Sequence, residues 1–236
     1  MRKYLLWLAL FTGFNLSASY SQKVYSTSSG ELIFSFANVN NSGAPVSSLM
    51  RFTCFFHTGE YWHMDLSPML GIFTGVGIRN VGFITKGQND PAQLADNSID
   101  EVKRRSYTLG FPLAIKFGSF KDNFYLYAGG EYELLFHYKE KHFKGGTKIK
   151  TTEWFSNKTN RFLPSVFVGM QLPRGMNLKL KYYLYDFMNR DYVDENGNKP
   201  YANLKSQVFY LSLSFNVRTR RVKDKITHKD TNIALL

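Results

Sequence analysis

Apolar side chains alternate with small or polar ones, residue by residue, over long stretches of this 236-residue chain. Segment 107–117 is the clearest case: Tyr, Leu, Phe, Leu, Ile and Phe occupy its odd positions, and Thr, Gly, Pro, Ala and Lys its even ones. A helix cannot place every second residue on one face. A β-strand does, because successive side chains point to opposite sides. The alternation therefore predicts a strand with two different faces.

The same alternation recurs along the chain and predicts eight strands. They are the segments 31–38, 49–62, 69–82, 107–117, 124–138, 160–171, 177–188 and 208–217. Several exceed the roughly five or six residues that are common in soluble sheets. Short connections at 64–68, 119–123 and 172–176 alternate with long polar ones at 39–48, 83–104, 141–158 and 189–204.

This pattern of connections is typical of outer-membrane barrels, which have short periplasmic turns and longer extracellular loops. We therefore expect an all-β fold, an eight-stranded antiparallel up-and-down transmembrane β-barrel with short periplasmic turns and long extracellular loops. The expected location is the cell outer membrane.

The first residues have the composition of an export signal. Arg2 and Lys3 precede an apolar run at 4–14, which is too short to span a bilayer, and small residues follow. We expect four segments: a signal peptide at 1–21, a periplasmic lead-in at 22–29, the barrel at 30–217 and a basic periplasmic tail at 218–236. The single cysteine, Cys54, excludes an internal disulfide and a cysteine-based zinc site.

Alternation alone leaves open which face points inward. A soluble lipocalin-like barrel would bury the apolar face and bind an apolar ligand, whereas a membrane barrel turns it to lipid. Strands near the roughly 9–11 residues that cross a bilayer favour the membrane reading. So do aromatic side chains at both strand ends, which form belts at membrane interfaces. These are Trp62, Phe117, Phe120 and Phe124 at the short turns, and Tyr107, Phe136, Tyr138 and Phe162 at the long loops.

Three stretches carry a resemblance: RFTCFFHTGEYWHMDLSPMLGIFTGVGIRNVGFI at 51–84, SYTLGFPLAIKFG at 106–118 and FYLYAGGEYELLF at 124–136. With them the chain resembles the PorT-like outer-membrane β-barrel family of Gram-negative bacteria over 30–217. The resemblance implies an envelope location and, because some members are linked to secretion machinery, an envelope or secretion complex as a partner. The barrel insertion machinery is a further expected partner, with Phe215 as the aromatic it would recognise.

By strand parity, eight charged side chains are expected to form a polar network in the lumen: Arg51, Arg79, Lys116, Glu131, Glu133, Arg161, Lys179 and Lys181. An eight-stranded barrel is just wide enough for side chains to fill. Glu131 and Glu133 should therefore pair with cations across the lumen, for which Arg51, Arg79 and Lys181 are candidates. The network is expected to plug the barrel. The alternative is a narrow polar conduit or an anion site, because six cations face two carboxylates.

The third long loop is rich in lysine and should lie just above the outer leaflet. Lysine donates charge-assisted hydrogen bonds to phosphate, so we expect contact with lipopolysaccharide at Lys139, Lys141, Lys144, Lys148 and Lys150. The basic tail at 218–236 contains no aromatic residue, which argues against nucleic-acid binding.

Catalysis has no motif in the sequence. His137, expected on the lumen face, lies near Ser156 and Glu140 in the sequence, but no GxSxG motif occurs and the acidic loop around Asp191 lacks EF-hand spacing. We expect no enzymatic activity, no cofactor and no metal, and a structural or binding role in the cell envelope. Two alternatives stay open: an outer-membrane enzyme acting on lipid at the extracellular rim, and a soluble periplasmic barrel.

Overall fold

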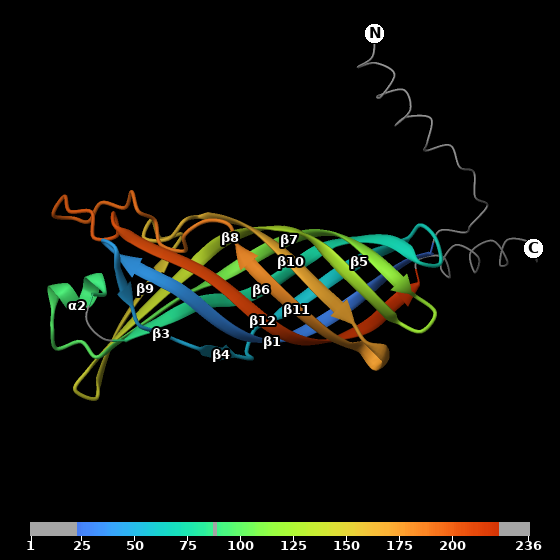
Figure 1. Ribbon diagram of the computed structural model, residues 1–236, viewed down its shortest axis with the longest axis horizontal. Coiled ribbons are helices and arrows are strands. Elements are labelled where there is room, and N and C mark those ends of the chain that lie inside the picture. The colour runs from blue at the N-terminus through green and yellow to red at the C-terminus, as the bar shows by residue number, and fades with distance from the viewer. Residues whose placement is uncertain (1–22, 87–88, 222–236) are drawn as a thin grey trace, which may run out of the picture.

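The computed structural model describes residues 23–86 and 89–221 (Figure 1). The signal peptide expected at 1–21 lies outside the described residues, as does the tail from residue 222 onward. Among the described residues, no helix is long and apolar enough to cross a membrane.

Eight antiparallel strands close into a barrel, as predicted (Figure 1). They are β1 (Lys23–Asn41), β5 (Thr58–Asp65), β6 (Leu70–Lys86), β7 (Glu101–Ser119), β8 (Phe124–Lys144), β10 (Phe162–Gln171), β11 (Met176–Tyr183) and β12 (Leu204–Arg221). Each strand pairs with the next one in this order, and β12 pairs with β1 to close the ring.

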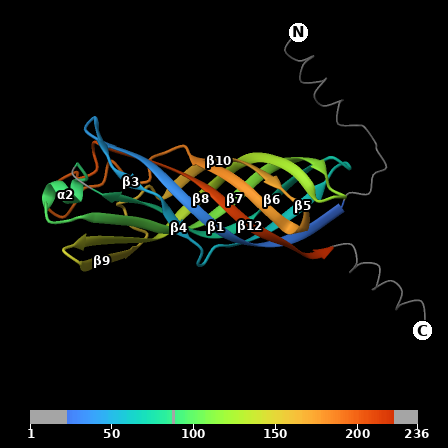
Figure 2. The same ribbon diagram turned by 60° about the horizontal axis from the view of Figure 1, so that its bottom comes forward.

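The connections alternate in length around the ring. The chain turns at 66–69, 120–123 and 172–175, where the last turn contains the 3₁₀ turn η1 (Pro173–Gly175). The opposite end carries the long connections and their elements: β2 (Ala44–Val46), β3 (Ser48–Leu49), β4 (Arg51–Thr53), α2 (Pro91–Ala95) and β9 (Thr147–Trp154). Figure 2 shows α2 and β9 together at this end.

Several strand ends differ from the sequence prediction. β1 starts at Lys23, so most of the lead-in expected at 22–29 belongs to the barrel wall, and β12 continues to Arg221. The strand expected at 49–62 is divided into β4 and β5, because the chain bends out at 54–57. β11 ends at Tyr183 rather than at residue 188, since Phe187 and Met188 turn inward and are buried.

The apolar side chains of the barrel wall point outward. Leu113, Ile115 and Val168 are exposed on the outside, whereas Lys116 and Glu133 are buried inside. This is the arrangement of a membrane barrel and the reverse of a soluble lipocalin-like barrel, which buries its apolar face. The alternative of a soluble barrel is thereby overturned.

A β-bulge in β8 changes the parity of that strand. Tyr107 pairs with His137 and Thr108 pairs with Leu135, so Phe136 is the extra residue. A bulge places two residues against one and reverses the faces beyond it. Tyr138, expected on the outer face, is therefore buried inside. His137, expected in the lumen, lies outside against Trp154, with ring centroids 4.5 Å apart.

The interior of the extracellular half contains a large cluster of apolar side chains. Phe83, Tyr138, Phe187, Tyr201 and Leu204 belong to one buried cluster there. A second, smaller cluster, which includes Phe73, Tyr127 and Phe167, lies nearer the short turns.

Candidate functional site

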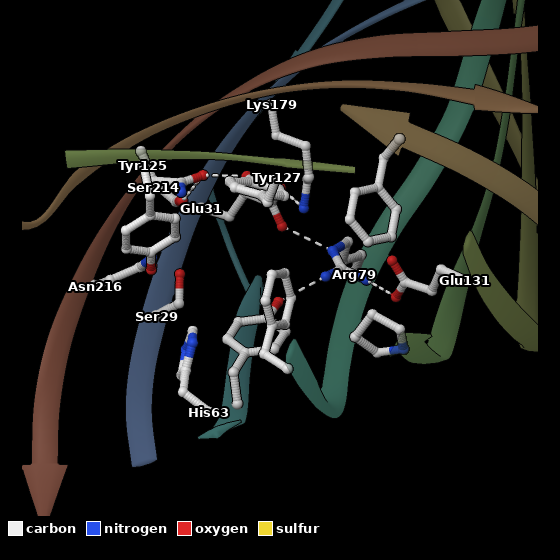
Figure 3. Close-up of a pocket in the computed structure, with 15 residues that line it drawn as sticks. Ser29, Glu31, His63, Arg79, Tyr125, Tyr127, Glu131, Lys179, Ser214 and Asn216 are labelled. Carbon is white, nitrogen blue, oxygen red and sulfur yellow. Dashed lines mark hydrogen bonds and ion pairs between the residues drawn. The ribbon is translucent and has the colours of Figure 1, made fainter. Parts of the chain in front are cut away.

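Arg79 on β6 is the centre of the charged network in the lumen (Figure 3). Its Nε donates to Glu31 Oε2 over 2.7 Å, and its Nη1 donates to Glu131. Its Nη2 donates to the Tyr61 hydroxyl over 2.7 Å. One guanidinium therefore joins β1, β5, β6 and β8 across the barrel, because its planar fork of donors reaches several acceptors at once.

Two lysines of β11 complete the network from the opposite wall. Lys179 Nζ lies 2.7 Å from Glu31 Oε1, and Lys181 Nζ donates to Glu131 Oε2 over 2.7 Å. Lys181 also pairs with Glu133, whose Oε2 accepts a 2.8 Å hydrogen bond from the Tyr183 hydroxyl. All these charged side chains are buried. Every charge thus has an opposite partner, as buried charges require.

The network is balanced in charge, with Arg79, Lys179 and Lys181 against Glu31, Glu131 and Glu133. The excess of cations expected from the sequence is absent for two reasons. Arg51, Lys116 and Arg161 lie outside this network, and Glu31 adds a carboxylate that the sequence pattern did not identify. Glu31 belongs to a segment whose alternation is weak. Following the parity of β1 back from Ile33, which is buried inside, would have placed Glu31 in the lumen.

The remaining predicted lumen residues lie elsewhere. Lys116 is buried toward the short turns, where its Nζ pairs with Asp65 and donates to the Tyr25 hydroxyl over 3.0 Å. Arg51 is buried but donates to the Asn80 backbone oxygen over 3.0 Å and not to a glutamate. Asp65, like Glu31, was missed by the sequence reasoning.

Arg161 is exposed and does not belong to the lumen network. The parity of β10 does not extend to it, because the strand begins at Phe162 and Arg161 lies in the bend before it. Its guanidinium is 3.4 Å from Asn157 Oδ1 on the surface, and only its backbone oxygen meets the barrel, where it accepts from Leu135 N–H over 2.8 Å.

The cavity that the network lines is small. Its volume is about 30 Å³, with Glu31, Arg79, Tyr127 and Lys179 in its wall (Figure 3). A space of this size holds about one or two water molecules. Side chains from both walls therefore fill the middle of the barrel.

A second buried ion pair fixes the loop that carries α2. Arg104 Nη1 lies 2.6 Å from Asp90 Oδ2, and Arg104 Nη2 lies 2.7 Å from Asp90 Oδ1. Glu140 lies 3.1 Å from Arg104 Nε, and Asp90 also caps α2 by accepting from Ala92 N–H over 3.0 Å. Burial alone would raise the pKa of the Asp90 carboxyl, but the neighbouring Arg104 guanidinium outweighs it and lowers that pKa.

The predicted lipopolysaccharide lysines lie on the extension of β8 and on β9. Lys139, Lys141, Lys148 and Lys150 share one face of this hairpin, as the register pairs Lys141 with Lys150 and Phe143 with Lys148. Lys144 points to the other side, where its Nζ pairs with Asp96 over 3.1 Å. Lys103 and Arg105 of β7 add to the same face, opposite Lys141 and Lys139.

A cleft of about 430 Å³ lies between this hairpin and the chain after β3. Its wall on β7 and β8 is cationic, and its wall at 51–55 combines Phe52 and Phe55 with Arg51, Thr53 and Cys54. The lining consists of Arg51, Phe52, Thr53, Cys54, Phe55, Ile84, Lys103, Arg105, Lys139 and Lys141. Within the described ranges, no group of three or more His, Cys, Asp or Glu residues is arranged to hold a metal ion.

Comparison with known proteins supplies no family. No protein-family model matches the chain, and no curated protein matches it. The chain is similar in structure to Ail, the attachment invasion locus protein of Yersinia pestis, at 11% identity and a TM-score of 0.37, over 84% of this chain and 100% of that one.

Two further solved structures are similar at the same level. Neisserial surface protein A matches at 12% identity and a TM-score of 0.41, over 85% of this chain and 100% of that one. The outer membrane protein OprG from Pseudomonas aeruginosa matches at 11% identity and a TM-score of 0.36, over 84% and 97% of the two chains. The features of the barrel itself indicate where it lies. A closed antiparallel barrel with an apolar outside and a charged, filled inside is an outer-membrane β-barrel.

Proposed function

We propose that the protein is a non-conducting outer-membrane barrel with a binding role at the cell surface. The observation that carries this proposal is the balanced ion network of Glu31, Arg79, Glu131, Lys179 and Lys181, which crosses the lumen and leaves a cavity of only about 30 Å³. Such a lumen is a rigid interior rather than a channel, because opening it would expose several ion pairs at once.

Planar bilayer recording tests the closed lumen. Protein that has been shown to be folded by its altered gel mobility before boiling should produce no steady conductance, whereas a porin reconstituted in the same bilayers should conduct. Steady openings from the folded protein would contradict the proposal.

The binding role is contact with the phosphates of lipopolysaccharide through the lysine hairpin. Lys139, Lys141, Lys148 and Lys150 lie on one face at the extracellular end, where the outer-leaflet phosphates are. Replacing all four by Gln should reduce the lipopolysaccharide that co-purifies with the barrel and should sensitise cells to detergent and polymyxin. The control is Lys199→Gln with Lys205→Gln, two exposed lysines away from the hairpin. Equal effects of the two sets would count against the proposal.

Membership in the PorT-like family, a partner in an envelope or secretion complex and recognition of Phe215 by the insertion machinery belong to the same proposal. The residues that carry the resemblance form β4 to β8. Phe215 is exposed on the outer face of β12. The proposal includes no catalytic activity. Crosslinking in intact envelopes, with a Phe215→Ala variant compared with Phe124→Ala, tests the partners. If the Phe215→Ala variant inserts into the outer membrane as well as the unchanged protein does, the insertion machinery does not recognise Phe215.

A further inference from the structure

The cationic wall of the cleft contains like charges placed directly opposite one another. Lys103 lies directly opposite Lys141, and Arg105 lies directly opposite Lys139, in the register of β7 with β8. Lys141 also lies directly opposite Lys150 in the register of β8 with β9. Like charges in directly opposed positions destabilise a sheet. An anion bound against these three pairs of cations would relieve their repulsion.

The protein supplies little compensation of its own. Glu101 pairs with Lys103 over 3.0 Å. Within the ranges that the structure describes, no carboxylate forms an ion pair with Arg105, Lys139 or Lys141. Nε of Arg105 is buried and has no hydrogen-bond partner among the described residues. Glu140, the nearest carboxylate in sequence, pairs with Arg104 and His142 instead.

The opposite wall of the cleft presents two exposed aromatic side chains beside Arg51, Thr53 and Cys54. Phe52 and Phe55 are both more than half exposed, and the neighbouring Phe56 packs edge-on against Tyr107, with ring centroids 6.3 Å apart. Tyr107 stacks in turn with Phe136, which stacks with Trp154. These rings lie on the outer face directly below the cations, where an aromatic belt meets the membrane interface.

We propose that this cleft binds one phosphorylated glycolipid of the outer leaflet, with its phosphate on Lys103, Arg105, Lys139 and Lys141 and an acyl chain along Phe52 and Phe55. The inference rests on the proposed lipopolysaccharide contact and narrows it to a single site. Arginine and lysine donors match a phosphate group. The exposed aromatic wall at membrane level requires an apolar part of the ligand as well, which free phosphate lacks.

Binding of purified lipid A to the full-length barrel in detergent micelles tests the site. Native mass spectrometry would count bound molecules, with bisphosphorylated lipid A, monophosphoryl lipid A and inorganic phosphate as probes. One bisphosphorylated molecule should bind per barrel, monophosphoryl lipid A should bind more weakly, and inorganic phosphate should compete poorly. Equal competition by inorganic phosphate would overturn the lipid assignment.

Two matched charge variants separate the cleft from the hairpin. Lys103→Gln with Arg105→Gln removes two cations of the cleft, and Lys148→Gln with Lys150→Gln removes two from the hairpin outside it. The first pair should weaken lipid A binding by about a hundredfold, from about tenfold per lost charged hydrogen bond, and the second by less than about threefold. The variant with Lys103→Gln and Arg105→Gln also loses repulsion between like charges, so it should fold. Its gel mobility before boiling should be that of a folded barrel.

The outcomes distinguish the two proposals. Equal weakening by both pairs would overturn the cleft and leave a diffuse lipopolysaccharide contact in place. No saturable lipid A binding to the unchanged protein would overturn both proposals.

Two aromatic variants test the other wall of the cleft. Phe55→Ala should weaken lipid A binding several-fold without changing the competition by inorganic phosphate. Phe124 is an exposed aromatic at the opposite end of the barrel, so Phe124→Ala should leave lipid A binding unchanged. Equal effects of the two Phe variants would remove the aromatic wall from the site.

Discussion

Arg79 and Glu31 meet inside the barrel, with the arginine Nε 2.7 Å from the glutamate Oε2 and both side chains at most 5% exposed. The two residues come from β6 and β1, which are not adjacent in the ring. This ion pair therefore links two strands that are not neighbours, through the lumen. It adds to the backbone hydrogen bonds that link neighbouring strands around the barrel.

Removal of one partner from this pair should be costly. Arg79→Gln leaves Glu31 and Glu131 with one cation fewer in a buried site, which should lower the free energy of unfolding by about 3–5 kcal/mol. Asp96→Asn breaks the exposed pair with Lys144 and should change the stability little, because water screens an exposed ion pair. Urea unfolding in lipid vesicles measures both, and similar losses for the two variants would argue against a stabilising lumen network.

The same leucine-to-arginine change should have very different costs at two similarly exposed positions. Leu113 is 64% exposed on the barrel wall and Leu94 is 62% exposed on α2, beyond the membrane. Leu113→Arg places a charge in hydrocarbon and should cost about 2–4 kcal/mol, whereas Leu94→Arg meets water and should cost almost nothing. Thr108→Arg instead adds bulk to the filled lumen and should prevent folding.

Two adjacent glycines of β8 should differ sharply in their tolerance of a side chain. A Cβ on Gly129 would overlap the backbone oxygen of Leu113 and lie 2.7 Å from the Ala114 Cα, whereas a Cβ on Gly130 meets only Ser165 O at 3.5 Å. Gly129→Ala should cost about 1–3 kcal/mol through strain, and Gly130→Ala should stay within about 0.5 kcal/mol of the unchanged protein. Similar unfolding midpoints for the two variants would contradict the close packing of the backbone at Gly129.

The loop of α2 should detach only in acid. The pKa of Asp90 is lowered in the folded protein by Arg104, so its contribution to stability is complete above the ordinary carboxyl pKa of about 4 and is lost as the pH falls through the lower value. Hydrogen exchange at 89–100, corrected for intrinsic rates, should remain slow from pH 7 to about pH 4 and rise below it.

Asp90→Asn is the matched variant for this acid transition. It should expose the loop at every pH, because Arg104 would then be left with Glu140 alone. Protection of the loop in this variant, or its loss near pH 6 in the unchanged protein, would contradict the role given to the pair.

The fold could be predicted because side chains on a strand alternate with a period of two and because lipid and lumen demand different side chains. The faces of β7 over 107–117 and of β12 over 208–217 follow the sequence pattern. Parity failed where the strand is irregular, at the bulge of Phe136, and where it was extended past a strand end, at Arg161.

The partners within the site could not be predicted, because they depend on the stagger between strands. Nothing in the sequence places Glu31 beside Arg79 and Lys179 rather than beside other lumen residues. The apolar layer of Phe83, Phe187 and Tyr201 also combines β6 with the long connection between β11 and β12, which only the closed barrel brings together.

The central claim is that the apolar face lies in lipid while the charges fill the lumen. Because Cys54 is the single cysteine, a nitroxide can be placed at Leu113→Cys on the barrel wall and at Leu94→Cys on α2 in a Cys54→Ser background. Collision with oxygen and with a water-soluble nickel chelate in lipid vesicles then reports the surroundings of each label. The label at Leu113 should be open to oxygen and closed to nickel, and the label at Leu94, which meets water, should be open to nickel. A label at Leu113 that is closed to both reagents, or open to nickel, would contradict the account.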